Sequence, residues 1–259
     1  MNSRAVGSLI PPPRQYLGGS LNRIIRLVSR EREVRAAVED DFHHFRVALR
    51  HDGRRVTDVT SDTLRAPYTL CSAAGARLDE LRGEEITTDL TKLTRHVDAR
   101  SQCTHQFDLA CIAVAMAARG EGVRHYHAIV EDSTTDHFRA TLDRDGARVL
   151  EWQMKGDDIL SPDPYSGRTI NSGFTGFVSQ YLEGESAEAA LVLRRTVFIA
   201  SGRGLDYWVD KLPHAIATGG CWVQQEERHQ QASRNKGTTR DFTGLTDRLT
   251  AEDDNWLGW

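Results

Sequence analysis

The chain has 259 residues, of which 27% are charged and 39% hydrophobic, and its formal net charge is −4. This length and composition suffice for a buried core in one large domain or two small ones. The chain lacks the excess of positive charge that is expected of a protein that binds nucleic acid or an anionic membrane. Because we find neither an apolar run of roughly 20 residues nor an export signal, we expect a cytoplasmic protein whose four cysteines are reduced.

Residues 1–41 are predicted to form an N-terminal arm. The first 20 residues are polar and interrupted by Pro and Gly, which favours an extended segment. Residues 21–28 combine β-branched side chains with arginines, a pattern that fits an edge strand or a short amphipathic segment. Residues 30–41 are dense in charge and are interpreted as a solvated stretch.

A first structural unit is predicted over residues 42–122. Hydrophobic and polar residues alternate over 45–49, Asp52-Gly53 follows, and a second β-rich run comes next, which together predict a β-hairpin. After a Pro that interrupts strand pairing, the spacing of hydrophobic residues predicts helices over 70–81 and 102–119, each ending close to a Gly.

A second unit is predicted over residues 123–204, with its elements in the same order. Its hairpin turns at Asp145-Gly146, as the first hairpin turns at Asp52-Gly53, and helices are expected over 174–182 and 187–200. We interpret this repeated order as an internal duplication, although shared turn chemistry alone could produce two similar hairpins.

The expected fold is therefore α+β, an internally duplicated β-hairpin plus two helices, with the helices packed on one face of an antiparallel sheet. Residues 205–259 are predicted to form a polar C-terminal extension with a short helix over 207–212. Residues 224–239 fit either a solvated helix or a flexible linker. Trp256 and Trp259 are predicted to dock on the body or on a second subunit, because exposed indoles gain nothing from water.

Candidate catalytic residues gather at the start of the helix over 102–119. With Thr104 as its N-cap, Cys103 precedes the helix, and His105 and Asp108 share one face at positions i and i+3. The positive end of the helix dipole would stabilise a thiolate, and a His–Asp pair can act as an oriented acid and base. The same residues also fit an ordinary N-terminal turn with a buried Cys, so both interpretations stay open.

Two histidines beside carboxylates form a second candidate group. His43 and His44 follow Asp40-Asp41, and neighbouring strand residues point to opposite faces, so at most one of them can share a site with His105. We include His44 among the catalytic candidates. The group lacks the reinforcing i, i+4 spacing of a helical metal site, and no metal is predicted.

Substrate-binding candidates come from the second unit. Arg194 and Arg195 lie in an apolar helix and could hold a carboxylate or phosphate. Trp152 and Tyr165 could wall a pocket. The chain has no glycine-rich nucleotide motif, no G-x-S-x-G and no H-E-x-x-H, so we expect no cofactor.

Several motifs resemble a bacterial family known only as a domain of unknown function. They lie within residues 40–204 and are Asp40–Arg46, His51–Gly53, Arg65–Pro67, Gln102–His105, Phe107–Leu109 and Leu193–Arg195. This resemblance implies no reaction. A weaker resemblance is to iron–sulfur scaffold proteins of the IscU, NifU and SufE type, in which a hairpin with Asp-Gly precedes a Cys-bearing segment. Cys71 and Cys103 stand at comparable places, but the third cysteine ligand of those families has no counterpart.

Together these features predict a small-molecule enzyme. We expect a cofactor-independent lyase or isomerase that uses acid–base chemistry on an aromatic or carboxylated metabolite, as in aromatic catabolism. The alternatives are a sulfur or iron–sulfur handling protein and a non-catalytic binding module. The substrate is the expected partner, and the possibility of a homo-oligomer stays open.

Overall fold

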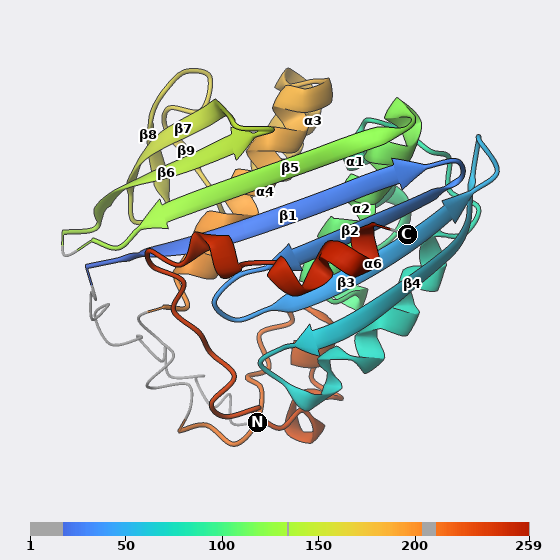
Figure 1. The fold of residues 1–259 in the computed structure, drawn as a ribbon. Coiled ribbons are helices and arrows are strands. Elements are labelled where there is room, and N and C mark those ends of the chain that lie inside the picture. Colours follow the sequence, from blue (N-terminus) through green and yellow to red (C-terminus); the bar gives the residue numbers. More distant parts are fainter. Residues whose placement is uncertain (1–17, 134, 204–210, 259) are drawn as a thin grey trace, which may run out of the picture.

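The computed structural model describes residues 18–133, 135–203 and 211–258. Within them, nine antiparallel strands form one sheet in the order β4-β3-β2-β1-β5-β6-β7-β8-β9 (Figure 1). The strands are β1 (Ser20–Arg30), β2 (Glu33–Glu39), β3 (His44–His51), β4 (Val56–Arg65), β5 (Gly122–Glu131), β6 (His137–Arg144), β7 (Ala147–Lys155), β8 (Asp158–Ser161) and β9 (Arg168–Thr169).

The helices connect and follow these strands. The α-helices are α1 (Leu90–His96), α2 (Thr104–Arg119), α3 (Phe174–Tyr181), α4 (Gly184–Ala200) and α6 (Asp254–Leu257). The 3₁₀-helices are η1 (Thr69–Cys71), η2 (Ala73–Leu81), η3 (Ala99–Ser101), η4 (Trp222–Gln224), η5 (His229–Gln231), η6 (Thr246–Arg248) and η7 (Ala251–Asp253). No helix in the described ranges is both long enough and apolar enough to cross a bilayer.

Each half of the sheet is an up-and-down meander of four strands followed by helices. β1 to β4 precede α1 and α2, whereas β5 to β8 precede β9, α3 and α4. β1 and β5 pair from Ser20 opposite Glu131 to Ser29 opposite Gly122, and this pairing joins the halves into one sheet. The mixed α/β fold with an antiparallel sheet is therefore confirmed, but the sheet is larger than the expected pair of hairpins.

Both hairpins with Asp-Gly turns form as predicted. β3 pairs with β4 across Asp52-Gly53, and β6 pairs with β7 across Asp145-Gly146. They differ in position, because the first lies at one edge of the sheet and the second lies inside the other half. The internal duplication itself stays a prediction.

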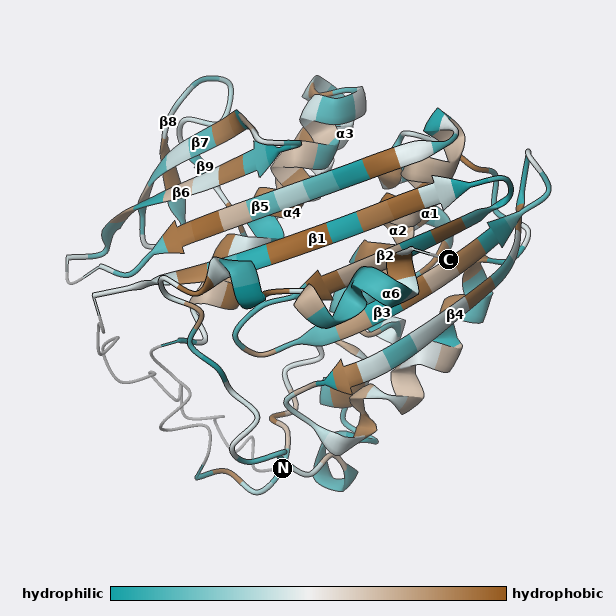
Figure 2. Cartoon of the chain, in the orientation of Figure 1, coloured by the Kyte–Doolittle hydropathy of each residue, from teal (hydrophilic) through white to brown (hydrophobic). Residues whose placement is uncertain are grey.

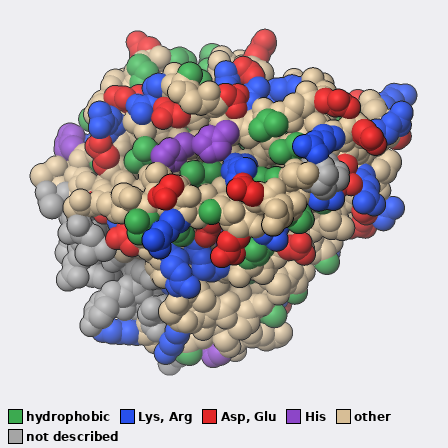
Figure 3. Space-filling view, viewed as in Figure 1, with side chains coloured by type: hydrophobic (Ala, Val, Ile, Leu, Met, Phe, Trp, Pro, Cys, Tyr) green, Lys and Arg blue, Asp and Glu red, His purple; other side chains and the backbone are tan. Residues whose placement is uncertain are grey.

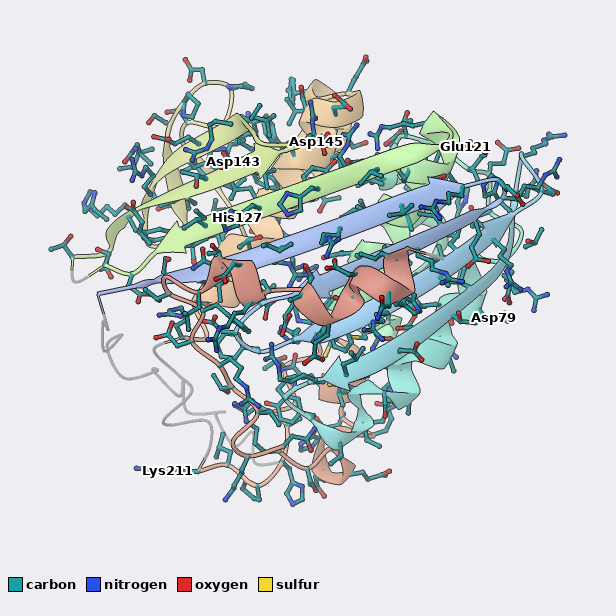
Figure 4. All side chains as sticks on the ribbon, in the orientation of Figure 1. Asp79, Glu121, His127, Asp143, Asp145 and Lys211 are labelled. Carbon is teal, nitrogen blue, oxygen red and sulfur yellow. The ribbon has the colours of Figure 1, made fainter. Side chains whose placement is uncertain are left out.

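Alternation along the strands gives the sheet one apolar face and one polar face, visible as bands of colour in Figure 2. On β1, Leu21 and Leu27 belong to the main hydrophobic core, whereas Ile24 packs with Phe242 and Leu249 in a separate cluster. The main core is therefore on one side of the sheet, and the C-terminal segment covers part of the other side.

The helices of the two units lie on one side of the sheet, and the short α6 of the C-terminal segment lies on the other. α2 contacts β1, β2 and β3, and α4 contacts β5, β6 and β7, both behind the sheet in Figure 1, whereas α6 lies in front against β2. Arginines on the polar face hold this C-terminal segment. Arg26 pairs with Asp254 at 2.6 Å, and the Trp256 ring lies 5.5 Å from the guanidinium carbons of Arg35 and Arg46. The predicted docking of Trp256 on the body is confirmed, while Trp259 lies outside the described residues.

Residues 20–30 and 33–39, assigned to an arm from sequence, form central strands instead. Their arginines suggested exposure, but the charges are satisfied by partners distant in sequence, such as Asp254 for Arg26. Residues 1–17 of the expected arm lie outside the described part of the chain.

The main helix predictions hold with small changes of boundary. α2, α3 and α4 occur where expected, but the segment over 70–81 forms the 3₁₀-helices η1 and η2 rather than an α-helix. The segment 224–239 forms neither a long helix nor a free linker, since its backbone is bonded to the body, for example from Asn235 N–H to the carbonyl of Pro67 at 2.8 Å. Most of the expected helix over 207–212 lies outside the described residues.

Candidate functional site

A cavity of about 150 Å³ lies between α2 and α4, on the helical side of the sheet. β1 also lines it, and α1 and α3 contribute residues, so both halves of the chain build it. Most of the wall is aliphatic, formed by Ile25, Leu90, Leu109, Ile112, Leu191 and Val192. Four charged side chains complete the lining: Arg23, Asp108, Arg194 and Arg195.

Two of these arginines are neighbours on α4. The Nε of Arg195 donates to the carboxylate of Asp108 on α2. The Nε of Arg194 donates to the carbonyl of Ile170 at 2.6 Å. Burial lowers the pKa of Arg194, and the positive charge of Arg195 lowers it further. An anion bound in the cavity would offset this repulsion.

The third arginine joins the cavity to a buried polar cluster. Arg23 is only 2% exposed, and its Nη1 donates to the carboxylate of Asp40. Its Nε is buried and has no hydrogen-bond partner among the described residues. An unmade hydrogen bond of this kind costs about 1–3 kcal/mol, so an acceptor on a ligand would be favoured here.

Asp40 organises the turn between β2 and β3. Its Oδ1 accepts hydrogen bonds from the backbone N–H groups of Phe42 and His43, both at 2.9 Å, as Asp side chains commonly do in turns. The same oxygen lies 3.0 Å from Nδ1 of His43. The carboxylate favours the tautomer with the proton on Nδ1, which leaves Nε2 of His43 free of hydrogen bonds to the described residues.

Charge and burial set the protonation states of this pair. Burial would raise the pKa of Asp40, but His43 and Arg23 together lower it well below its usual range, so Asp40 is ionised. Burial lowers the pKa of His43 despite the opposing effect of Asp40, so the imidazole is neutral near pH 7.

His105 lies directly against His43. The two ring centroids are 3.9 Å apart, and Nδ1 of His105 is buried without a partner among the described residues. Burial lowers the pKa of His105 well below its usual value, and His43, Arg23 and Arg195 act in the same direction. Two neutral imidazoles therefore contact each other, with their planes tilted by 39°, near the arginines of the cavity.

The structure brings together three of the predicted site residues. Asp108, Arg194 and Arg195 line the same cavity. His105 lies near Arg195, whose positive charge lowers the pKa of His105. His105 and Cys103, however, are not among the described residues that line the cavity.

His44 is on the opposite face of the sheet from His105. Its Nε2 lies 2.9 Å from Oδ2 of Asp253, and its Nδ1 lies 3.6 Å from Glu39. Alternation along β3 separates it from the cluster, so His44 anchors the C-terminal segment, and His43 is the histidine that meets His105.

Trp152 and Tyr165, predicted to bind substrate, are buried core residues. Their ring centroids are 5.4 Å apart, and Trp152 also meets Phe174 at 5.6 Å. Neither side chain lines the cavity. The sequence pattern of aromatic and acidic residues therefore reflected packing beneath α3.

Cys103 is the residue before α2, and α2 begins at Thr104 without a side-chain capping bond. Burial raises the pKa of the Cys103 thiol to about 11, which outweighs the expected effect of the helix dipole. Burial also raises the pKa of Cys71, with Cys103 and Cys221 acting in the same direction. In the described ranges, no group of three or more His, Cys, Asp or Glu residues is arranged to hold a metal ion.

Sequence reasoning missed Arg23 and gave Asp40 only a minor part. A signal was present, because Arg23 falls between Leu21 and Ile25 in the alternation of β1 and so faces the core with them. A buried arginine requires an acidic partner, and Asp40 was a nearby candidate.

Residues 26–119 match the family model described as "Protein of unknown function (DUF2889)". This stretch contains Asp40, His43, His105 and Asp108, but it ends before Arg194. The predicted resemblance to a family of unknown function is confirmed over these residues, whereas the likeness to IscU, NifU and SufE scaffolds finds no support. A comparison with curated proteins gave no match.

Proposed function

We propose that the protein is an enzyme that binds a small carboxylate with an apolar body between α2 and α4 and transforms it by acid–base chemistry, as a lyase or isomerase. The observation that carries this proposal is an aliphatic cavity with three arginine side chains in its wall. Guanidinium groups match the planar geometry of carboxylates, and branched aliphatic walls favour an apolar body.

The size of the cavity supports a ligand with a single ring. A cavity of about 150 Å³ lined by aliphatic side chains accommodates a benzene molecule in other proteins, and the volume here is about 150 Å³. We therefore propose substrates close to benzoate in size, which is consistent with a role in aromatic catabolism.

Asp108 is the carboxylate available for proton transfer in the cavity. It is held by Arg195, and an incoming ligand carboxylate would compete for that guanidinium. A ligand that takes Arg195 releases Asp108, which then acts as the base toward a nearby C–H or O–H group. Substrate binding and activation of the base would thus be one event.

A sulfur-handling role for Cys71 and Cys103 is the alternative. Its support is that the backbone N–H of Trp222 donates to the carbonyl of Gln102 at 2.8 Å, which brings the chain at Cys221 beside the chain at Cys103. Cys103 and Cys221 also raise the pKa of Cys71. Purification without oxygen, followed by elemental analysis for iron and zinc and mass spectrometry for persulfide, tests it. A non-catalytic module that captures a partner through Trp256 is less favoured, because Arg35 and Arg46 already hold that ring.

We also propose a cytoplasmic location and descent of the two halves from one duplicated unit. Four cysteines without a disulfide among them are consistent with a reducing compartment. The matching order of four strands followed by helices supports the duplication.

Calorimetric titration with a panel of small carboxylates tests the binding proposal. Benzoate, 4-hydroxybenzoate and cyclohexanecarboxylate should bind, whereas benzyl alcohol, which lacks the charge, should bind at least tenfold more weakly. Arg195→Gln should weaken benzoate binding by a similar factor, and the exposed Arg139→Gln should not. Equal binding of benzoate and benzyl alcohol would refute the carboxylate site.

Proton NMR in D₂O tests the acid–base chemistry without a known substrate. Each member of the panel that binds is incubated with protein, and deuterium incorporation or chemical change is followed over time. Wild-type protein should promote at least one such change, and Asp108→Asn should abolish it while retaining binding. Binding with no chemical change across a broad panel would leave a binding protein and exclude the enzyme.

A further inference from the structure

A series of side-chain contacts leads from the cavity into the core. Arg23 lines the cavity and donates to Asp40, and Oδ1 of Asp40 lies 3.0 Å from Nδ1 of His43. The His43 ring in turn contacts the His105 ring, with the two planes tilted by 39°. Each of these residues is placed for binding or proton transfer, yet only Arg23 reaches the ligand space.

We propose that binding of an anion at Arg23 is coupled to uptake of one proton by the contacting pair of His43 and His105. The pair would thus be the proton-handling site behind the cavity, charged only when a ligand is present. This inference rests on the proposed carboxylate-binding function and adds to it the residues that supply the proton.

The coupling follows from the charges around the histidines. In the empty cavity, Arg23 pairs with Asp40 and disfavours a second positive charge nearby. Both histidines are then neutral, because burial and the adjacent guanidiniums lower their pKa values. A ligand carboxylate adds one negative charge beside Arg23, and this charge favours the imidazolium form of the pair.

The geometry also selects which atom carries the new proton. Nδ1 of His43 already faces Asp40, so the added proton goes to Nε2 of His43 or to the unpartnered Nδ1 of His105. Asp40 acts as the positioning residue, since it fixes the imidazole and neutralises the imidazolium once it forms.

Other ionisable groups near the pair must be separated from this effect. The charged neighbours of His43 and His105 are Asp40, Arg23, Arg65 and Arg195. Asp41 adjoins Asp40, and burial raises its pKa to about 7, so it could also take up a proton.

Calorimetric titration with benzoate in buffers of different ionisation enthalpy measures the protons taken up on binding. We expect wild-type protein to take up protons on binding benzoate at pH 6.5 and almost none at pH 9. His43→Gln should reduce the uptake at pH 6.5 at least threefold. The matched variant His44→Gln, at the neighbouring residue whose side chain lies on the opposite face of the sheet, should leave the uptake intact, as should Asp41→Asn.

Histidine NMR provides the test that needs no variant. The ring C–H signals of the ten histidines are followed from pH 5 to pH 9 with and without benzoate. Two of them should titrate at higher pH when benzoate is bound. Benzoate binding without proton uptake and without such a shift would overturn this inference and leave the binding function standing. Absence of benzoate binding would overturn both.

Discussion

Replacing Asp40 with Asn perturbs the buried cluster at its centre. The carboxylate is completely buried, and it accepts hydrogen bonds from Arg23, from Nδ1 of His43 and from the backbone N–H groups of Phe42 and His43. Asn has nearly the same shape, and its carbonyl oxygen can still accept the two backbone bonds. The variant therefore removes the charge while it preserves the turn.

The expected loss of stability follows from the charge that remains. Arg23 is 2% exposed, so its guanidinium would stay buried without a counterion. Removing one partner of a buried ion pair costs about 3–5 kcal/mol, and the retained backbone bonds place Asp40→Asn at the lower end, about 3 kcal/mol. Typical domains have a free energy of unfolding of about 5–15 kcal/mol, so the variant should still fold at pH 7.

The effect should depend on pH in a defined direction. The folded-state pKa of Asp40 is below the unfolded-state value, so its ionised form contributes stability above about pH 4. That contribution is lost as the pH falls from there through the folded-state pKa.

Urea denaturation followed by circular dichroism gives the free energy of unfolding at each pH. The difference between wild type and Asp40→Asn should be full at pH 7 and shrink below pH 4. A difference under about 0.5 kcal/mol at pH 7, or one that grows in acid, would refute the importance of this ion pair.

Three further outcomes are expected. Burial raises the pKa of Asp41 to about 7, so between pH 5 and pH 7 the folded protein binds a proton that the unfolded chain lacks. The free energy of unfolding should therefore fall from pH 5 to pH 8. Thermal unfolding of Asp41→Asn should show a midpoint temperature that depends less on pH. Trp256→Ala should lower the free energy of unfolding by about 1–2 kcal/mol through two lost cation–π contacts, whereas Trp256→Phe should lose less; equal losses would contradict the ring's role. Iodoacetamide at pH 7.5 should modify half-buried Cys221 at least tenfold faster than Cys103, measured by peptide mass spectrometry, and equal rates would contradict the burial of Cys103.

Local signals predicted the elements of this fold well. Asp52-Gly53 and Asp145-Gly146 marked two true hairpins, and hydrophobic spacing with a following Gly marked α2. These signals succeed because turn chemistry and helix capping act between residues close in sequence. The same signals allowed Asp108 and Arg195 to be predicted as site residues, because each lies on a helix that the sequence predicted correctly.

Long-range pairing explains what the sequence did not reveal. The position of β1 at the centre of the sheet depends on its contact with β5, about 100 residues away. Its partner on the polar face, the C-terminal segment, is more distant still. The arginines of residues 21–28 therefore resembled an exposed edge, although Asp40 and Asp254 neutralise Arg23 and Arg26.

The two faces of the central strands account for the division of roles among the candidate residues. Arg23 and His43 face the helices and the cavity, whereas Arg26 and His44 face the C-terminal segment. In both neighbourhoods an arginine and a histidine pair with carboxylates, so composition alone cannot tell which group serves function. On the helical side, Arg23 has a buried nitrogen without a hydrogen-bond partner among the described residues and lines the cavity, and His105 has another in the core behind it. Since unsatisfied donors in a core are costly, a ligand that satisfies them is the simplest reason for that side to retain them.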